Sequence, residues 1–140
     1  MKNALRKIFI YSMLMAPVMI HMHCGDESKA SLEESMNRGK VVYEKYCLTC
    51  HQADGSGVQK LNPPLRGTSF VLGDPIQLIQ IVKKGMSGVQ VDEETYNNPM
   101  PAFEQVLDEQ QTADVLTYIR NSFGNQAGAV TVADVEKAGK

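Results

Sequence analysis

The hydrophobic positions of this chain follow helical spacing over most of its length, and one continuous apolar run precedes them. That run extends from Ile8 to Ile20. Helical patterning is expected over 75–84 and again from residue 109, whereas Val89–Tyr96 alternates enough to predict a short extended stretch. The pattern therefore predicts a mainly helical domain behind an apolar leader.

Boundary signals define two of the predicted helices. Asp74 followed by Pro75 is a capping carboxylate with proline at the first helical position, and Gly85 ends that helix. Asp108 with Gln111 three residues later predicts a capping box at the start of the last helix. The apolar positions that these helices are expected to bury are Ile76, Leu78, Ile79, Val82, Val115, Leu116, Tyr118 and Ile119.

The beginning of the chain is typical of an export signal. Lys2, Arg6 and Lys7 precede the apolar run, which is shorter than the roughly 20 apolar residues that a membrane-spanning helix needs. Residues 1–23 are therefore predicted to be a signal peptide. The protein is then expected to be exported and periplasmic.

Cys24 follows the leader directly and lies where the acylated cysteine of a bacterial lipoprotein would lie. Acylation there would tether the protein to a membrane through its lipid chains. The alternative is cleavage after Ala30, where Ser28 and Ala30 fit the small-x-small rule of ordinary signal peptidase. We favour lipidation, because an unpaired cysteine in an exported protein needs an explanation.

The composition indicates one small domain with a poorly supplied core. The chain has 140 residues, of which 43% are hydrophobic and 21% charged, and it has no Trp. A domain of this size often needs a disulfide, a metal or a large cofactor for stability.

From Cys24 onward the formal charge is −5, because three of the 14 Lys and Arg but none of the 16 Asp and Glu lie before it. Nucleic acid is therefore excluded as a partner, since it requires a basic surface.

The sequence Cys47-Leu48-Thr49-Cys50-His51 is the strongest chemical signal in the chain. A C-x-x-C-H motif in an exported protein predicts attachment of a c-type haem. Residues three and four apart share a face of a helix, so both thiols and the imidazole would point the same way. Cys47 and Cys50 would form thioethers with the porphyrin, and His51 would bind its iron.

The motif has three alternative uses: a Cys47–Cys50 disulfide, a thioredoxin-like dithiol and a zinc site. The dithiol motif should follow a strand, whereas Met36–Tyr46 has helical character. Zinc needs a fourth ligand, and beyond the leader the chain offers only Cys24 or a carboxylate. Haem is the favoured interpretation.

With these motifs in order, the chain from about Gly39 to Asn125 resembles the class I cytochrome c family, in particular its small bacterial monohaem members. Gly39 and Tyr43 resemble the first helix of that family, and 118–125 resembles its last helix, with Tyr118 as the aromatic partner of Gly39. The resemblance implies an all-α cytochrome c fold: three main helices around one covalent haem, with the first and last helices crossing.

The resemblance also implies a set of haem contacts. The family's Pro-x-Leu-x-Gly matches Pro63, Leu65 and Gly67, so the Pro63 carbonyl would accept a hydrogen bond from His51 and Leu65 would pack on the ring. Tyr96 would lie near the haem. Met100, between two prolines, would be the second axial ligand. Met36 and Met86 are the other methionines beyond the leader, and Met86 is the main competitor.

The function that the resemblance implies is electron transfer without catalysis, by a free carrier or by a subunit of an oxidase or reductase complex. Partners would be redox proteins: a terminal oxidase, a reductase or a cytochrome complex. The alternatives are a haem enzyme or ligand sensor with a labile methionine, and a haem-free dithiol or zinc module.

The expected organisation is a leader at 1–23, a polar linker at 24–35, the haem domain at 36–125 and a tail at 126–140.

Overall fold

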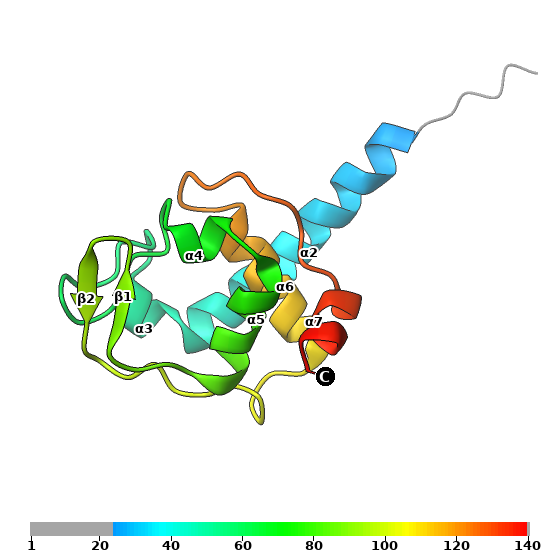
Figure 1. Ribbon diagram of the computed structural model, residues 1–140. Coiled ribbons are helices and arrows are strands. Elements are labelled where there is room, and N and C mark those ends of the chain that lie inside the picture. The colour runs from blue at the N-terminus through cyan, green and yellow to red at the C-terminus, as the bar shows by residue number, and fades with distance from the viewer. Residues whose placement is uncertain (1–23, 140) are drawn as a thin grey trace, which may run out of the picture.

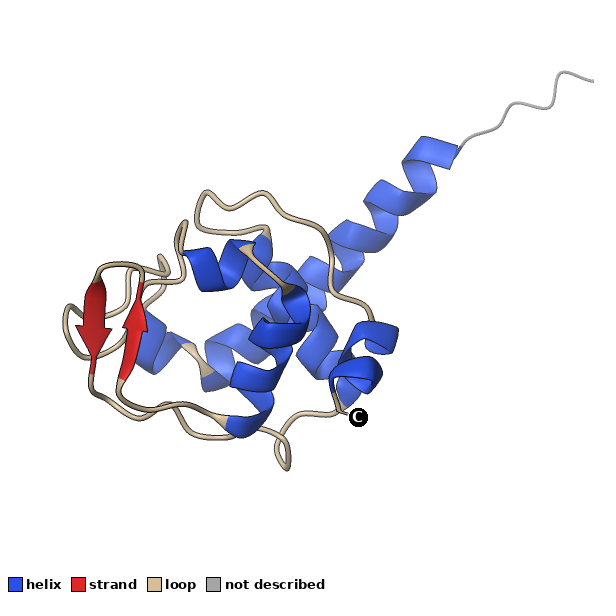
Figure 2. Ribbon diagram, in the orientation of Figure 1, coloured by secondary structure: helices blue, strands red, loops and turns tan. Residues whose placement is uncertain are grey.

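Helices dominate this computed structural model, which describes residues 24–139 (Figures 1 and 2). The helices are α2 (Cys24–Tyr46), α3 (Leu48–His51), α4 (Ser69–Leu72), α5 (Pro75–Lys84), α6 (Glu109–Arg120) and α7 (Val132–Ala138). Strands β1 (Val89–Val91) and β2 (Glu94–Tyr96) pair antiparallel, with Val89 opposite Tyr96. The predicted extended stretch is therefore this hairpin, and α5 and α6 begin at the predicted caps Asp74 and Asp108.

Helices α2 and α6 cross closely at Gly39. A Cβ atom at Gly39 would overlap the Asp114 carbonyl oxygen and would lie 2.8 Å from the Cβ of Tyr118. The absence of a side chain is thus what allows the two backbones to approach. Next to the crossing, the Tyr43 ring lies 5.4 Å from the Tyr118 ring and 5.3 Å from the Phe123 ring. The predicted pairing of Gly39 with Tyr118 is confirmed.

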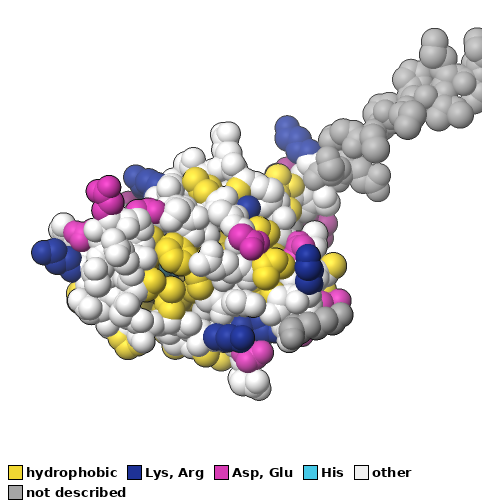
Figure 3. Space-filling view, viewed as in Figure 1, with side chains coloured by type: hydrophobic (Ala, Val, Ile, Leu, Met, Phe, Trp, Pro, Cys, Tyr) yellow, Lys and Arg dark blue, Asp and Glu magenta, His cyan; other side chains and the backbone are white. Residues whose placement is uncertain are grey.

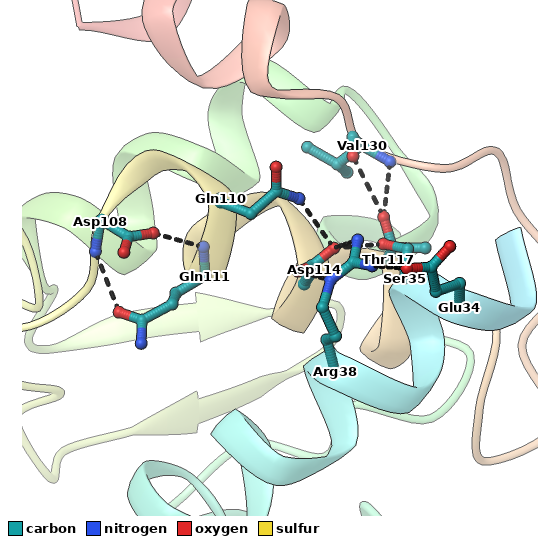
Figure 4. Close-up of polar contacts among 9 residues, drawn as sticks. All are labelled: Glu34, Ser35, Arg38, Asp108, Gln110, Gln111, Asp114, Thr117 and Val130. Atoms are coloured by element: carbon teal, nitrogen blue, oxygen red, sulfur yellow. Dashed lines mark hydrogen bonds and ion pairs between the residues drawn. The ribbon is translucent and has the colours of Figure 1, made fainter. Parts of the chain in front are cut away.

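A buried carboxylate joins the same two helices on the other side of Gly39 (Figure 4). Asp114 accepts hydrogen bonds from Ser35 Oγ (2.6 Å), Gln110 Nε2 (3.1 Å), and Nε and Nη2 of Arg38 (2.7 and 2.9 Å). Burial alone would raise the pKa of Asp114, but these hydrogen bonds outweigh it and hold the pKa below its usual value. The carboxylate is therefore charged and fully engaged.

The stretch 24–35, which was expected to be a polar linker, is helical in the structure. The whole stretch belongs to α2, which extends from the body of the domain in Figure 1. Part of the stretch consists of residues that favour helix, among them Ala30, Leu32 and Glu33, and Ser35 already contacts the domain through Asp114. None of the helices described over residues 24–139 has the length and apolarity to cross a membrane.

The expectation of a tail at 126–140 is also wrong. Thr131 and Asp134 form a capping box, and the helix that follows packs against α5 and α6. Val130 and Val135 are buried, and the Thr117 hydroxyl in α6 both donates to the Val130 carbonyl and accepts from its N–H (Figure 4). The Thr-x-x-Asp cap was the sequence signal for this helix, which is short and carries few large apolar residues.

Candidate functional site

Two adjoining cavities lie between the motif helix α3, α5 and the loop that carries Met100. They enclose about 720 and 570 Å³, part of which is open to solvent. The residues that line both are Cys47, His51, Pro63, Met86, Met100 and Phe103. The structure thus brings the C-x-x-C-H motif and the methionine loop together around one space.

Most of the wall of the larger cavity is apolar and comes from α4, α5 and α6, with Leu107 from the segment just before α6. These residues are Phe70, Val71, Leu78, Ile81, Val82, Leu107, Val115, Leu116 and Ile119, with Val91 from β1. Figure 3 shows hydrophobic side chains gathered between the hairpin and α5 on the viewed face. Several of these wall residues were predicted as ordinary core. That they surround a cavity could not be predicted, because it depends on how far apart the helices pack.

One cysteine precedes α3 and the other lies within it. Cys47 is its N-cap residue and accepts the His51 N–H at 2.9 Å through its carbonyl oxygen. Cys50 is exposed and lines the smaller cavity. Both are free thiols, and burial raises the pKa of Cys47 to about 11, with a further contribution from Cys50. Among residues 24–139 as described, no group of three His, Cys, Asp and Glu side chains forms a metal site.

The His51 ring is held in one tautomer. Its Nδ1 lies 3.0 Å from the Pro63 carbonyl oxygen. Because a carbonyl oxygen only accepts, Nδ1 must carry the proton, and Nε2 keeps its lone pair for a metal. Burial lowers the pKa of His51, and the bond to Pro63 only partly opposes this. The ring is therefore neutral, as a metal ligand must be.

The backbone around His51 is fixed by contacts that the sequence did not reveal. The Tyr43 hydroxyl donates to the Gln52 carbonyl at 2.6 Å, and the Gly57 N–H donates to the His51 carbonyl at 3.0 Å. Gln52 has a left-handed φ of 64°. A Cβ atom at Gly57 would overlap the Asn62 carbonyl oxygen and would lie 2.6 Å from that of Pro63. Gly57 thus allows the Pro63 carbonyl to lie where His51 needs it.

The segment that carries Met100 is held against the end of α5 by main-chain hydrogen bonds. The Met100 N–H donates to the Met86 carbonyl at 2.8 Å, and the Met86 N–H donates to the Met100 carbonyl at 3.1 Å. Phe103 N–H donates to the Val82 carbonyl at 3.0 Å, which satisfies one of the carbonyls left free at a helix end. The position of Met100 is therefore set by the fold itself.

Of the other predicted site residues, Leu65, Tyr96 and Cys24, only Leu65 lies at the cavities among those whose side chains the structure describes. Leu65 lines the larger cavity. Tyr96 is buried in the hairpin but lines neither cavity. The hairpin residues that line the cavities are Val89, which pairs with Tyr96 across the strands, and Val91 on the same strand as Val89. Cys24 begins α2, and its side chain lies outside the part of the chain that the structure describes.

The residues present fit a haem. The cavities offer apolar walls for a porphyrin, two free thiols at the spacing of a single turn, and a neutral imidazole with its Nε2 lone pair available. Met100 adds a thioether, a soft donor that suits haem iron. This donor set matches the covalent attachment that the motif predicts.

Comparison with known proteins agrees with this fit. The model of the cytochrome c family matches residues 36–123, more than half of the chain. A cytochrome c subunit of a quinone alcohol dehydrogenase from Gluconacetobacter polyoxogenes is 37% identical over 118 residues, which cover 80% of this chain and 25% of the relative. The cytochrome c subunit of gluconate 2-dehydrogenase from Pantoea cypripedii is 42% identical over 105 residues, 69% of this chain and 23% of the relative.

A shorter relative matches over most of its own length. Cytochrome c-552 from Thermus thermophilus is 34% identical over 92 residues, which cover 62% of this chain and 69% of the relative. By contrast, the chain spans about a quarter of the length of the dehydrogenase subunits. The chain therefore belongs to the cytochrome c family, as a class I monohaem member whose cofactor is a covalent haem c fitted by Cys47, Cys50 and His51.

Proposed function

We propose that this protein is an electron carrier whose haem iron is bound by His51 and Met100. The observation that carries the proposal is that both side chains line the same two cavities and are both held by backbone contacts. Haem c, when bound, supplies one-electron Fe(III)/Fe(II) chemistry. The chain's own task is to hold both ligands in place and to keep the ring in an apolar surrounding.

Each ligand has a separate effect on electron transfer. The carbonyl of Pro63 makes the His51 imidazole a better donor by accepting its Nδ1 proton. The thioether of Met100 favours the reduced state and raises the potential. With both axial positions filled, a small molecule has no free position at the iron, so a carrier is favoured over a ligand sensor.

We propose that the partners are redox proteins on the outer side of the cytoplasmic membrane, either as free enzymes or within a complex. Relatives named as cytochrome c subunits of dehydrogenases support this class of partner. Pro101 and Ala102 next to Met100 are exposed, and 95–103 carries no charged residue. An uncharged surface beside the ligand suits the small, weak contacts of redox encounters.

Lipidation of Cys24 is part of the proposal. Because α2 is continuous from Cys24 to Tyr46 and contacts the domain from Ser35 onward, a lipid on Cys24 would attach the haem domain through roughly 16 Å of helix at 1.5 Å per residue. Mass spectrometry of the mature N-terminus tests this. We expect a diacyl or triacyl mass on Cys24, whereas a free N-terminus at Ser31 would contradict the lipid anchor.

The ligand pair is tested by the absorption spectrum of the ferric protein. A weak far-red band marks a thioether on ferric haem, and we expect it in the wild type. Substitution Met100→Ala should remove or displace this band, while Met36→Leu on α2, which lines neither cavity, should leave it unchanged. Covalent haem without the band in the wild type would favour the ligand-binding enzyme or sensor instead.

A further inference from the structure

Met86 is directly opposite Met100 in the structure, and this pairing carries an inference beyond the ligand pair proposed above. The two residues exchange both main-chain hydrogen bonds, at 3.1 and 2.8 Å, as an isolated antiparallel bridge. In such a pair both side chains project from the same side of the ladder, with Cβ atoms roughly 5 Å apart. Because both residues line both cavities together with His51, that side faces the haem site.

The chemistry of the cavity walls leaves Met86 as the one spare soft donor. Cys47 and Cys50 are used by the thioether bonds to haem, and His51 occupies the other axial position. Among the described residues that line the cavities, the remaining polar side chains are Tyr46, Asn62, Thr68 and Asn98, which offer only oxygen or amide groups. A methionine thioether is a much better ligand for haem iron than these groups.

The surroundings of Met86 allow its side chain to move. Methionine has three rotatable bonds and adapts to irregular space. Gly85, the residue before Met86, is tightly surrounded, because a Cβ there would lie 2.5 Å from the Met100 carbonyl oxygen. Gly88, two residues after Met86, has a left-handed φ of 59°, and a Cβ added there would meet nothing within 4 Å. Open space therefore lies beside Gly88, and the Met86 side chain itself is only partly buried.

We propose that Met86 is a reserve axial ligand: when the Met100 sulfur is displaced or removed, the Met86 sulfur binds the iron in its place. The exchange breaks one iron–sulfur bond and forms another, with no proton or electron transferred. Since both thioethers are neutral, it buries no new charge. The inference rests on the proposed His51/Met100 ligation.

The test compares wild type, Met86→Leu, Met100→Ala and the double variant, with Met36→Leu as a control for loss of a methionine outside the cavities. The readouts are the far-red ferric band and the dissociation constant of added imidazole. We expect Met100→Ala to keep a displaced thioether band. The double variant should lose the band and bind imidazole at least about tenfold more tightly than Met100→Ala, since no thioether then competes.

Each contrary outcome has a separate meaning. If Met100→Ala and the double variant match in band and imidazole affinity, Met86 is no reserve ligand, and the His51/Met100 proposal stands. If Met86→Leu removes the band and Met100→Ala does not, Met86 is the main ligand and both assignments fail. If the wild type has no band, the proposed ligation fails. Met100→Leu, which retains apolar volume, replaces Met100→Ala if the latter loses helical circular dichroism.

Discussion

At the scale of single residues, the geometry of His51 depends on a glycine that makes no side-chain contact. The Pro63 carbonyl reaches His51 Nδ1 because Gly57 leaves room behind it. The resemblance to class I cytochromes c implied that Pro63 and His51 are partners, since both belong to motifs of that family. The part played by Gly57 could not be predicted, because the crowding comes from a loop that folds back to Asn62 and Pro63.

We predict that Gly57→Ala weakens the bond between His51 and Pro63 and raises the reduction potential. A weaker acceptor at Nδ1 makes the imidazole a poorer donor to ferric iron. The expected rise is roughly 60 mV, equivalent to a tenfold change for one electron. Protein-film voltammetry of wild type, Gly57→Ala and Gly67→Ala measures this rise.

Gly67→Ala is a matched control for backbone strain. Both glycines have a left-handed φ, 65° at Gly57 and 67° at Gly67, but an added Cβ at Gly67 meets nothing within 4 Å. We expect Gly67→Ala to leave the potential unchanged. Equal shifts in the two variants would contradict the role assigned to the Pro63 carbonyl.

At the scale of elements, the crossing of α2 and α6 is stabilised by apolar contact at Gly39 and by the buried carboxylate of Asp114. Patterning and capping signals predicted α5 and α6 with their first residues, because those signals are local. They did not predict the length of α2 or the helix α7. Residues 24–35 lack an apolar face, and the burial of Val135 depends on α5 and α6, which lie far away in sequence.

We predict that Asp114→Asn lowers the free energy of unfolding at pH 7 by about 1–3 kcal/mol, through loss of charge-assisted hydrogen bonds to Arg38 and Ser35. The folded-state pKa of Asp114 is below its usual value. Its stabilisation is therefore present above about pH 4, near the unfolded pKa, and is lost as the pH falls through the folded pKa. Denaturant titrations at pH 7 and pH 3 measure the difference between wild type and variant.

The control for Asp114 is Glu34→Gln, which removes the exposed partner of the same guanidinium. Arg38 Nη1 lies 2.9 Å from Glu34 in a pair four residues apart on α2. Exposed pairs of this kind contribute little, so we expect a small change that is similar at both pH values. A variant Asp114→Asn as stable as wild type at pH 7 would show that the carboxylate does not stabilise the crossing.

We predict that Val135→Ala lowers the free energy of unfolding by about 2 kcal/mol, because it empties a fully buried position between α7 and the core. Thermal unfolding of the haem-bound protein measures the change. Val41→Ala is the matched control, since Val41 is 65% exposed on α2. Equal stability of the two variants would mean that α7 does not belong to the cooperative unit.

At the scale of the whole molecule, the cofactor completes the core. The composition predicted a shortage of large apolar residues, and the helices enclose cavities whose apolar walls need a filling group. The class of fold and the attachment motif were predictable from the sequence, because a C-x-x-C-H motif and helix caps are local signals. The pairing of Met86 with Met100 was not, since it joins two loops through main-chain bonds.

The proposed electron transfer depends on one covalent haem bound by His51 and a methionine thioether. The most direct test is the absorption spectrum, oxidised and reduced, of protein matured with the haem-attachment machinery. We predict one haem per chain that survives denaturing electrophoresis, and a far-red ferric band in the folded protein. Absence of covalent haem would contradict haem attachment at Cys47 and Cys50, and covalent haem without that band would contradict an electron carrier with two protein ligands.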